Sequence, residues 1–100
     1  MDKKEFALSF IETIKSGEKD KIYKFLTSRT IIFIVEEKKE ISLDDFISYI
    51  DSNLLNQSIE IKRVFESNVS VKIEILSDKF KYDAMIFEIA DRRFKRIELM

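Results

Sequence analysis

The second half of the chain, from Ser58 to Met100, alternates apolar and polar residues with few interruptions. A period of two residues is typical of half-buried antiparallel strands, whose successive side chains point to opposite faces of a sheet. The apolar positions fall into segments at Ile59, Ile61 and Phe65; Val69, Val71, Ile73 and Ile75; Phe80, Tyr82, Ala84 and Ile86; and a last segment from Phe94 to Leu99. The pattern therefore predicts four consecutive strands in a curved sheet.

The first half of the chain has the spacing of amphipathic helices. Asp2 with Glu5, and Ser42 with Asp45, match the capping box that begins a helix. Each is followed by apolar residues three and four positions apart, which form a single stripe on a helix. The two stripes are Phe6, Ala7, Phe10, Ile11 and Ile14, and Leu43, Phe46, Ile47, Ile50 and Leu54. We expect one helix after each cap.

The residues between these two helices complete the predicted order. Gly17, the only glycine, stands where a helix ends in a left-handed conformation. A second short helix is expected over Ile22, Phe25 and Leu26. The β-branched run from Thr30 to Val35 predicts a buried strand, with a brief return strand at Ile41. The expected fold is one α+β domain over residues 1–100, with three N-terminal helices packed on a curved, mainly antiparallel sheet.

Composition excludes several classes of function. Eighteen basic and nineteen acidic residues leave no excess of the kind that nucleic-acid binding requires. There is no cysteine and no histidine, so thiolate chemistry and the commonest general base and metal ligand are missing. We therefore expect no metal, no cofactor and no nucleic acid. No apolar run is long enough to span a membrane, and the start lacks the apolar segment of a signal peptide, so a cytoplasmic protein is expected.

The apolar pattern also sets an expected register. A turn at Ser77–Asp78 would align Ile75 with Phe80, and a turn at Asp91–Arg92 would align Ile86 with Ile97. With this register the outer face of the sheet carries an apolar group at one end. Its members are Val64, Met85, Phe87, Ile89 and Phe94. Exposed apolar patches of this size mark interaction surfaces, so a sheet-to-sheet homodimer is favoured over scattered surface residues or a covering N-terminal segment.

These features together resemble the NTF2-like superfamily, the cystatin-like cone fold of ketosteroid isomerase and SnoaL-like proteins. The opening "FALSFIETIKSGEKDKIYKFL", the strand in "TIIFIVEEKKEIS", the helix "LDDFISYIDSNL" and the final sheet ending "FEIADRRFKRIEL" carry the resemblance over the whole chain. The family commonly has an Asp-Gly-Lys-Ile turn near the last strand, where this chain has "DRRF". The resemblance implies a pocket inside the cone and dimers through the outer face of the sheet. It implies no particular reaction.

The catalytic residues of the isomerase branch do not carry over. Its helix tyrosine, seven residues before the glycine, is Phe10 here, and its aspartate base in the first strand corresponds to Phe33. Its protonated carboxylic acid falls on Asp83 or Ala84. Two losses and one ambiguous match disfavour isomerase chemistry.

Arg63 is the one charged residue in the middle of an expected inner strand face. It is either an anion anchor in the pocket or an edge arginine that reaches solvent or pairs with a carboxylate such as Glu12. Tyr82 is either a ligand contact or a core residue with its hydroxyl at the rim, and Glu88 is expected opposite Lys95. The expected pocket comprises Arg63, Tyr82, Phe10, Phe33, Phe46 and Ala84, and binds a small anionic or apolar ligand.

Three functions remain open from the sequence. The favoured one is a non-catalytic NTF2-like domain that binds a small ligand or acts as a dimeric interaction module. The second is a SnoaL-like or isomerase-like enzyme that transfers a proton on a small apolar substrate through Tyr82, Glu88 or Asp83. The third is a structural subunit of a larger assembly.

Overall fold

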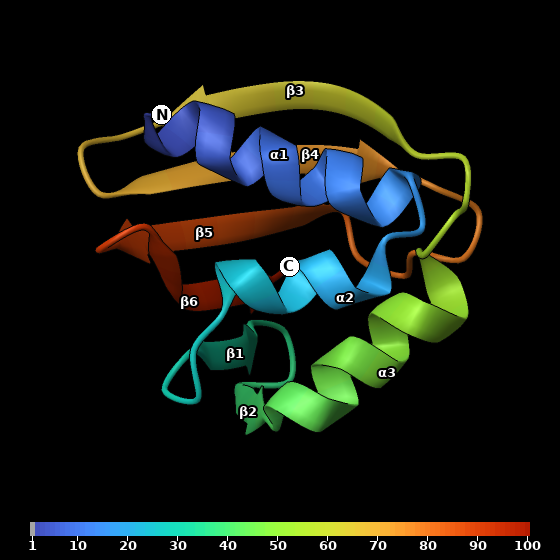
Figure 1. Ribbon diagram of the computed structural model, residues 1–100, viewed down its shortest axis with the longest axis horizontal. Helices are drawn as coiled ribbons and strands as arrows, with labels where there is room; N and C mark the ends of the chain where they lie inside the picture. The colour runs from blue at the N-terminus through green and yellow to red at the C-terminus, as the bar shows by residue number, and fades with distance from the viewer. Residues whose placement is uncertain (1) are drawn as a thin grey trace.

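The computed structural model, which describes residues 2–100, has its helices on one face of a single curved sheet (Figure 1). We call the face toward the helices the inner face and the opposite face the outer face. The helical elements are α1 (Lys3–Lys15), α2 (Lys19–Ile22) with the 3₁₀ helix η1 (Tyr23–Phe25), and α3 (Leu43–Asn53). The three predicted helices are therefore present, in the predicted order.

The two long helices begin at the predicted caps. The Asp2 carboxylate accepts a hydrogen bond from the amide of Glu5 at 2.8 Å. The Ser42 hydroxyl accepts one from the amide of Asp45 at 3.0 Å. Each bond satisfies an amide that has no partner within the helix. After α1, Gly17 adopts a φ of 76°, the left-handed conformation that glycine allows at a helix end.

Six strands form the sheet in the order β2-β1-β6-β5-β4-β3. Their bounds are β1 (Ile31–Ile34), β2 (Lys39–Ile41), β3 (Glu60–Glu66), β4 (Ser70–Leu76), β5 (Ala84–Ala90) and β6 (Arg93–Leu99). Of the five strand pairings within residues 2–100, the one between β1 and β6 is parallel and the other four are antiparallel, so the sheet is mainly antiparallel as predicted. The short strand at Ile41 is also present. The sheet is open, with β2 and β3 at its edges.

The side-chain directions expected for the second half of β3 are wrong. Ile61 pairs with Ile75, but Arg63 pairs with Glu74, so Lys62 is an extra residue that forms a β-bulge. Beyond the bulge, Val64 points to the inner face and packs against the core. Arg63 and its neighbour on the same face, Phe65, point outward, and Phe65 is 45% exposed.

The predicted start of β5 is also wrong. Phe80 and Tyr82 lie in a seven-residue connection after β4, which contains a turn closed by the Phe80 amide and the Ser77 carbonyl at 3.2 Å. As a result, Ile73 pairs with Met85 and not with Tyr82. The alternation through residues 80–86 therefore does not belong to one strand.

The two-residue turn at Asp91–Arg92 is present, but the strand after it contains a second bulge. Ile89 pairs with Phe94, whereas Glu88 pairs with Arg96, which leaves Lys95 as the extra residue. This bulge turns over the rest of β5 relative to the prediction. Glu88 consequently lies opposite Arg96 and not Lys95, on the outer face.

These two shifts overturn the predicted outer apolar patch. Met85, Phe87 and Phe94 have no exposed surface, and all three belong to the core. Ile89 and Val64 are partly buried against the same core. These five residues therefore belong to the inner face of the sheet and do not form a dimer surface.

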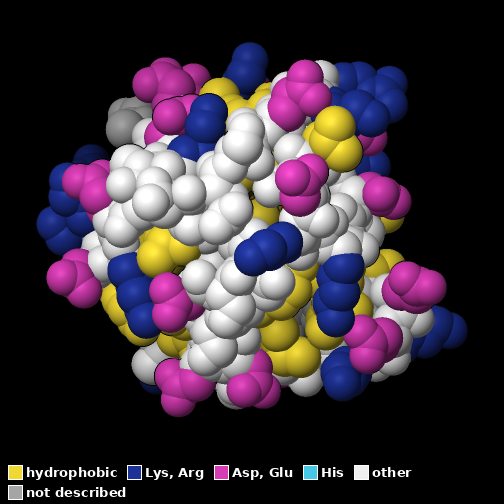
Figure 2. All heavy atoms as spheres, turned by 90° about the vertical axis from the view of Figure 1, so that its right-hand side faces the viewer, with side chains coloured by type: hydrophobic (Ala, Val, Ile, Leu, Met, Phe, Trp, Pro, Cys, Tyr) yellow, Lys and Arg dark blue, Asp and Glu magenta, His cyan; other side chains and the backbone are white. Residues whose placement is uncertain are grey.

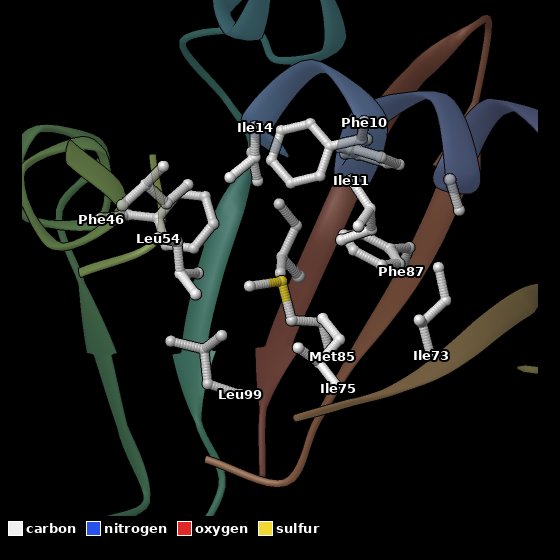
Figure 3. Close-up of a cluster of buried hydrophobic side chains, with 14 of the residues drawn as sticks. Phe10, Ile11, Ile14, Phe46, Leu54, Ile73, Ile75, Met85, Phe87 and Leu99 are labelled. Atoms are coloured by element: carbon white, nitrogen blue, oxygen red, sulfur yellow. The ribbon is translucent and has the colours of Figure 1, made fainter. Parts of the chain in front are cut away.

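The core fills the space between the inner face and the helices (Figure 3). Side chains from α1 and α3 meet side chains from β4, β5 and β6 there. The labelled residues are Phe10, Ile11, Ile14, Phe46, Leu54, Ile73, Ile75, Met85, Phe87 and Leu99. Burial of this apolar surface supplies the main favourable term for folding.

Acidic and basic side chains alternate over the end of the molecule at the right of Figure 1, as Figure 2 shows. Hydrophobic side chains lie between the charged ones, and neither charge sign dominates this end. Among residues 2–100, no helix has the length and apolar character needed to cross a membrane.

Candidate functional site

Two of the predicted pocket residues lie in the packed core. Phe10 and Phe46 are both fully buried. The ring of Phe10 packs edge-on against Phe94 at 5.0 Å and against Phe87 at 5.6 Å between centroids. Figure 3 shows the side chains of Phe10 and Phe46 directed into the space between helices and sheet. These rings fill the interior, and in that position they do not line an open pocket.

Two other predicted pocket residues, Arg63 and Phe33, lie on the outer face. The Nε of Arg63 donates to the Glu74 carboxylate at 2.6 Å, and the arginine side chain is 69% exposed. Phe33 lies on β1 with its ring covered by the guanidinium of Arg96, 4.8 Å from the ring centroid. The prediction that Arg63 faces the interior is therefore wrong, because the bulge at Lys62 reverses the direction of its side chain.

Tyr82 belongs to an aromatic cluster on the β4–β5 connection. Its ring lies 5.8 Å from that of Tyr49 on α3 and 5.7 Å from that of Phe80. The Tyr49 hydroxyl accepts from the Lys81 amide at 3.0 Å, which ties the connection to α3. Burial raises the pKa of Tyr49 because the charged phenolate would lose solvation. The cluster holds the β4–β5 connection against α3, and Arg63 is not a member of it.

The residues proposed for proton transfer are not brought together. Glu88 lies on the outer face of β5 opposite Arg96. Asp83 is exposed and lines a surface depression of about 240 Å³ with Arg63 and Glu74. Ala84, the alternative match, is 1% exposed and has no ionisable group. Within residues 2–100, no group of three acidic residues is arranged to hold a metal ion.

The outer face carries a distinct row of side chains across its middle. Reading across five neighbouring strands, the pairing partners are Phe33, Glu98, Ile86, Lys72 and Phe65. The row has an aromatic ring at each end, an aliphatic residue at its centre on β5, and one charge of each sign between. We call these five residues the central row.

Charged neighbours surround the aromatic ends of the central row. Arg96, which covers Phe33, also donates to the Glu98 carboxylate at 2.8 Å. Lys72 and Arg63 both lie 5.6 Å from the centroid of the Phe65 ring. Cation–π contacts of this kind attract the cations to the ring faces and hold them close to an apolar surface. The outer face is therefore an ordered mixture of apolar and charged groups.

Sequence reasoning missed the central row as a unit. The expected register places Ile86 on the inner face, whereas in the structure it lies on the outer face between Lys72 and Glu98. A signal was present in the apolar spacing: Ile61 and Val64, and Phe94 and Ile97, are three residues apart and not two. Each odd spacing encloses two consecutive charged residues and coincides with an observed bulge.

Solved structures of similar shape define the class of fold. An NTF2-like protein of unknown function from Cytophaga hutchinsonii superposes with a TM-score of 0.76 at 10% identity, over 100% of this chain and 89% of that one. A candidate SnoaL-like polyketide cyclase from Shewanella putrefaciens gives 0.74 at 10% identity, over 100% and 80%. The epoxide hydrolase/cyclase-like enzyme SalBIII gives 0.78 at 12% identity, over 98% and 88%.

The chain therefore has the NTF2-like fold, as its sequence pattern predicted. No protein-family model and no curated protein matches it in sequence. Because the fold is shared by proteins of unlike function, the fold by itself assigns none.

Proposed function

We propose that this protein is a non-catalytic interaction module that forms a homodimer through the outer face of its sheet. The observation that carries the proposal is the central row. A two-fold axis parallel to β5 would superpose the row on its own reverse. Ile86 would then meet its own copy, Glu98 would meet the partner's Lys72, and Phe33 would meet the partner's Phe65. The row is thus symmetric in shape and opposite in charge about its centre.

The size of the face supports a weak dimer. Four strands of seven residues and the four-residue β1, about 4.8 Å apart and at about 3.3 Å per residue, cover about 500 Å² per copy. The total of about 1,000 Å² lies at the low end for specific interfaces. The exposed apolar area is interrupted by charges, so we expect affinity in the micromolar range and a strong dependence on charge pairing.

Two further observations favour this role over acid–base catalysis. The interior is occupied by fully buried rings, including Phe10 and Phe46. The three groups proposed for proton transfer, Tyr82, Asp83 and Glu88, belong to a loop cluster, a surface depression and the outer face respectively. General acid–base chemistry needs such groups within hydrogen-bond reach of one substrate.

A charge-swap experiment tests the dimer. Sedimentation velocity of the wild type from low to high micromolar concentration should show a monomer–dimer equilibrium. Lys72→Glu and Glu98→Lys should each weaken it, because each places like charges across the axis. The double variant Lys72→Glu/Glu98→Lys should recover the association, since the opposite charges meet again in reversed positions.

Matched controls carry the same charge changes away from the outer face. Lys24→Glu on η1 and Glu36→Lys in the β1–β2 turn are exposed positions. Both should leave the equilibrium unchanged. A wild type that stays monomeric at high micromolar concentration would contradict the proposal, as would a double variant that dissociates as much as the sum of its single changes.

A further inference from the structure

We propose that a depression beside the β5–β6 turn binds the phosphate group of a small phosphorylated molecule. The depression has a volume of about 530 Å³. Four cationic side chains line it: Arg29, Arg92, Arg93 and Lys95. One acidic residue, Asp91, lines it with them. The site lies at the end of the molecule opposite the one in Figure 2, where charges of both signs alternate.

A buried hydroxyl holds the Arg29 loop against β6. Thr30 is 9% exposed, and its hydroxyl donates to the Phe94 carbonyl at 2.7 Å. The same oxygen accepts from the Thr27 amide at 2.9 Å. The Arg29 amide in turn donates to the Thr27 hydroxyl at 3.1 Å. Arg29 therefore approaches the strand that carries Arg93 and Lys95 from a backbone fixed by three hydrogen bonds.

The turn on the other side of the depression is held in an unusual conformation. Asp91 and Arg92 have φ values of 52° and 60°. Two successive left-handed residues make a type I′ turn, which favours asparagine or aspartate followed by glycine. An arginine in the second position is strained, and such strain is found where a side chain serves a purpose other than folding. The Arg93 guanidinium donates to the Arg92 carbonyl at 2.8 Å, which fixes its orientation.

Carboxylates of the protein neutralise little of the positive charge on these four side chains. Among residues 2–100, Arg29, Arg92, Arg93 and Lys95 form no ion pair, whereas Arg63 and Arg96 elsewhere are each paired with a carboxylate. A second depression, of about 460 Å³, shares Arg92 and Arg93 but is lined by Asp2 as well. Its Lys3 is neutralised by Glu66 at 2.7 Å. The unpaired charge is therefore concentrated on the Arg29 side.

The chemistry of these groups points to phosphate. Guanidinium groups present donors in a fork that matches the oxygens of phosphate. Several cations that line one depression favour a doubly charged anion over a single carboxylate. The volume lies in the range of small-molecule sites and is too small for a macromolecule. The site shares no residue with the central row, so a test of phosphate binding does not depend on the dimer proposal.

Calorimetry at low ionic strength tests the site with pyrophosphate and inorganic phosphate as probes. We expect pyrophosphate to bind the wild type, and its dissociation constant to rise at least about tenfold in Arg29→Gln and in Arg92→Gly. Arg63→Gln is the matched control, because it removes an arginine that is exposed but lies on the outer face. The control should bind as the wild type does.

A membrane lipid presents the same chemistry and is separated by a second arm. Vesicles of phosphatidylcholine containing phosphatidic acid are sedimented with the protein in the presence and absence of pyrophosphate. We expect pyrophosphate to displace any binding of the protein to the vesicles. Vesicle binding that pyrophosphate leaves intact would overturn the small-molecule assignment. The absence of pyrophosphate binding, or equal loss in Arg63→Gln, would overturn the site itself.

Discussion

Two single residues, Asp91 and Arg92, decide the local conformation of the β5–β6 turn. Asp91 and Arg92 both have positive φ, yet only Arg92 is of a type that a type I′ turn disfavours at its position. The hairpin forms nevertheless, because the apolar residues on both sides pair and bury. Arg92 therefore contributes conformational cost and positive charge at the same point, and these two effects can be separated by mutation.

Arg92→Gly should stabilise the protein. Glycine relieves the steric cost of the left-handed conformation. Part of this gain is offset by the larger backbone entropy that glycine gives the unfolded chain, so the net gain is about 0.5–1 kcal/mol. For a chain of this size we expect a rise in Tm of about 4 °C. Thermal unfolding measures it, and Arg29→Gly, at a position without positive φ, should give no such rise. A lower Tm in Arg92→Gly would show that the arginine side chain stabilises the fold.

Phe10→Tyr tests whether the interior is filled at the position where the isomerase branch has its tyrosine. The Phe10 ring is fully buried among Phe25, Phe87 and Phe94. A hydroxyl there would lose its solvation without a partner, at a cost of about 2 kcal/mol in unfolding free energy. Urea unfolding measures this cost, with Tyr49→Phe as a control for a hydroxyl at the rim. A Phe10→Tyr variant as stable as the wild type would indicate an open cavity.

At the level of elements, the sequence predicted which helices and strands form but not the register of every strand pair. Helices, caps, the Asp91–Arg92 turn and the strand content followed from local spacing and cap chemistry, which act within a few residues. The faces of β3 and β5 did not follow, because single bulges at Lys62 and Lys95 reverse every side chain beyond them. The predicted sites were wrong for the same reason. Arg63 points outward, and Met85, Phe87 and Phe94, which were predicted to form an interface, lie in the core.

Thr30→Val tests how the loop before β1 is joined to β6. Valine keeps the shape but removes the hydroxyl that serves both the Thr27 amide and the Phe94 carbonyl. Leaving these groups without their partner should cost about 2 kcal/mol of unfolding free energy. Thr30→Ser retains the hydroxyl and should lose less. If both variants are equally stable in chemical unfolding, the hydroxyl does not join the two elements.

For the whole molecule, the two proposed surfaces lie on different parts of the sheet. The interior is packed with side chains, and the proposed phosphate site is a surface depression beside the β5–β6 turn that Arg29, Arg92 and Arg93 line. The outer face is free of that charge excess and has paired cations, which suits contact with a second copy. The two proposals thus assign contact with a second copy to the outer face and anion binding to the end of the sheet at the β5–β6 turn.

The same symmetry that joins opposite charges in the central row brings Glu88 close to the partner's Glu88, since both lie on β5 near the proposed axis. Like charges at close range disfavour association by about 1 kcal/mol in a solvated interface. Glu88→Gln should therefore tighten the dimer, lowering its dissociation constant about threefold to fivefold in sedimentation equilibrium. Glu36→Gln, with the same change of charge in an exposed turn, should have no effect. A weaker dimer in Glu88→Gln would mean that Glu88 pairs with a cation across the interface, and the axis would have to be placed elsewhere on the face.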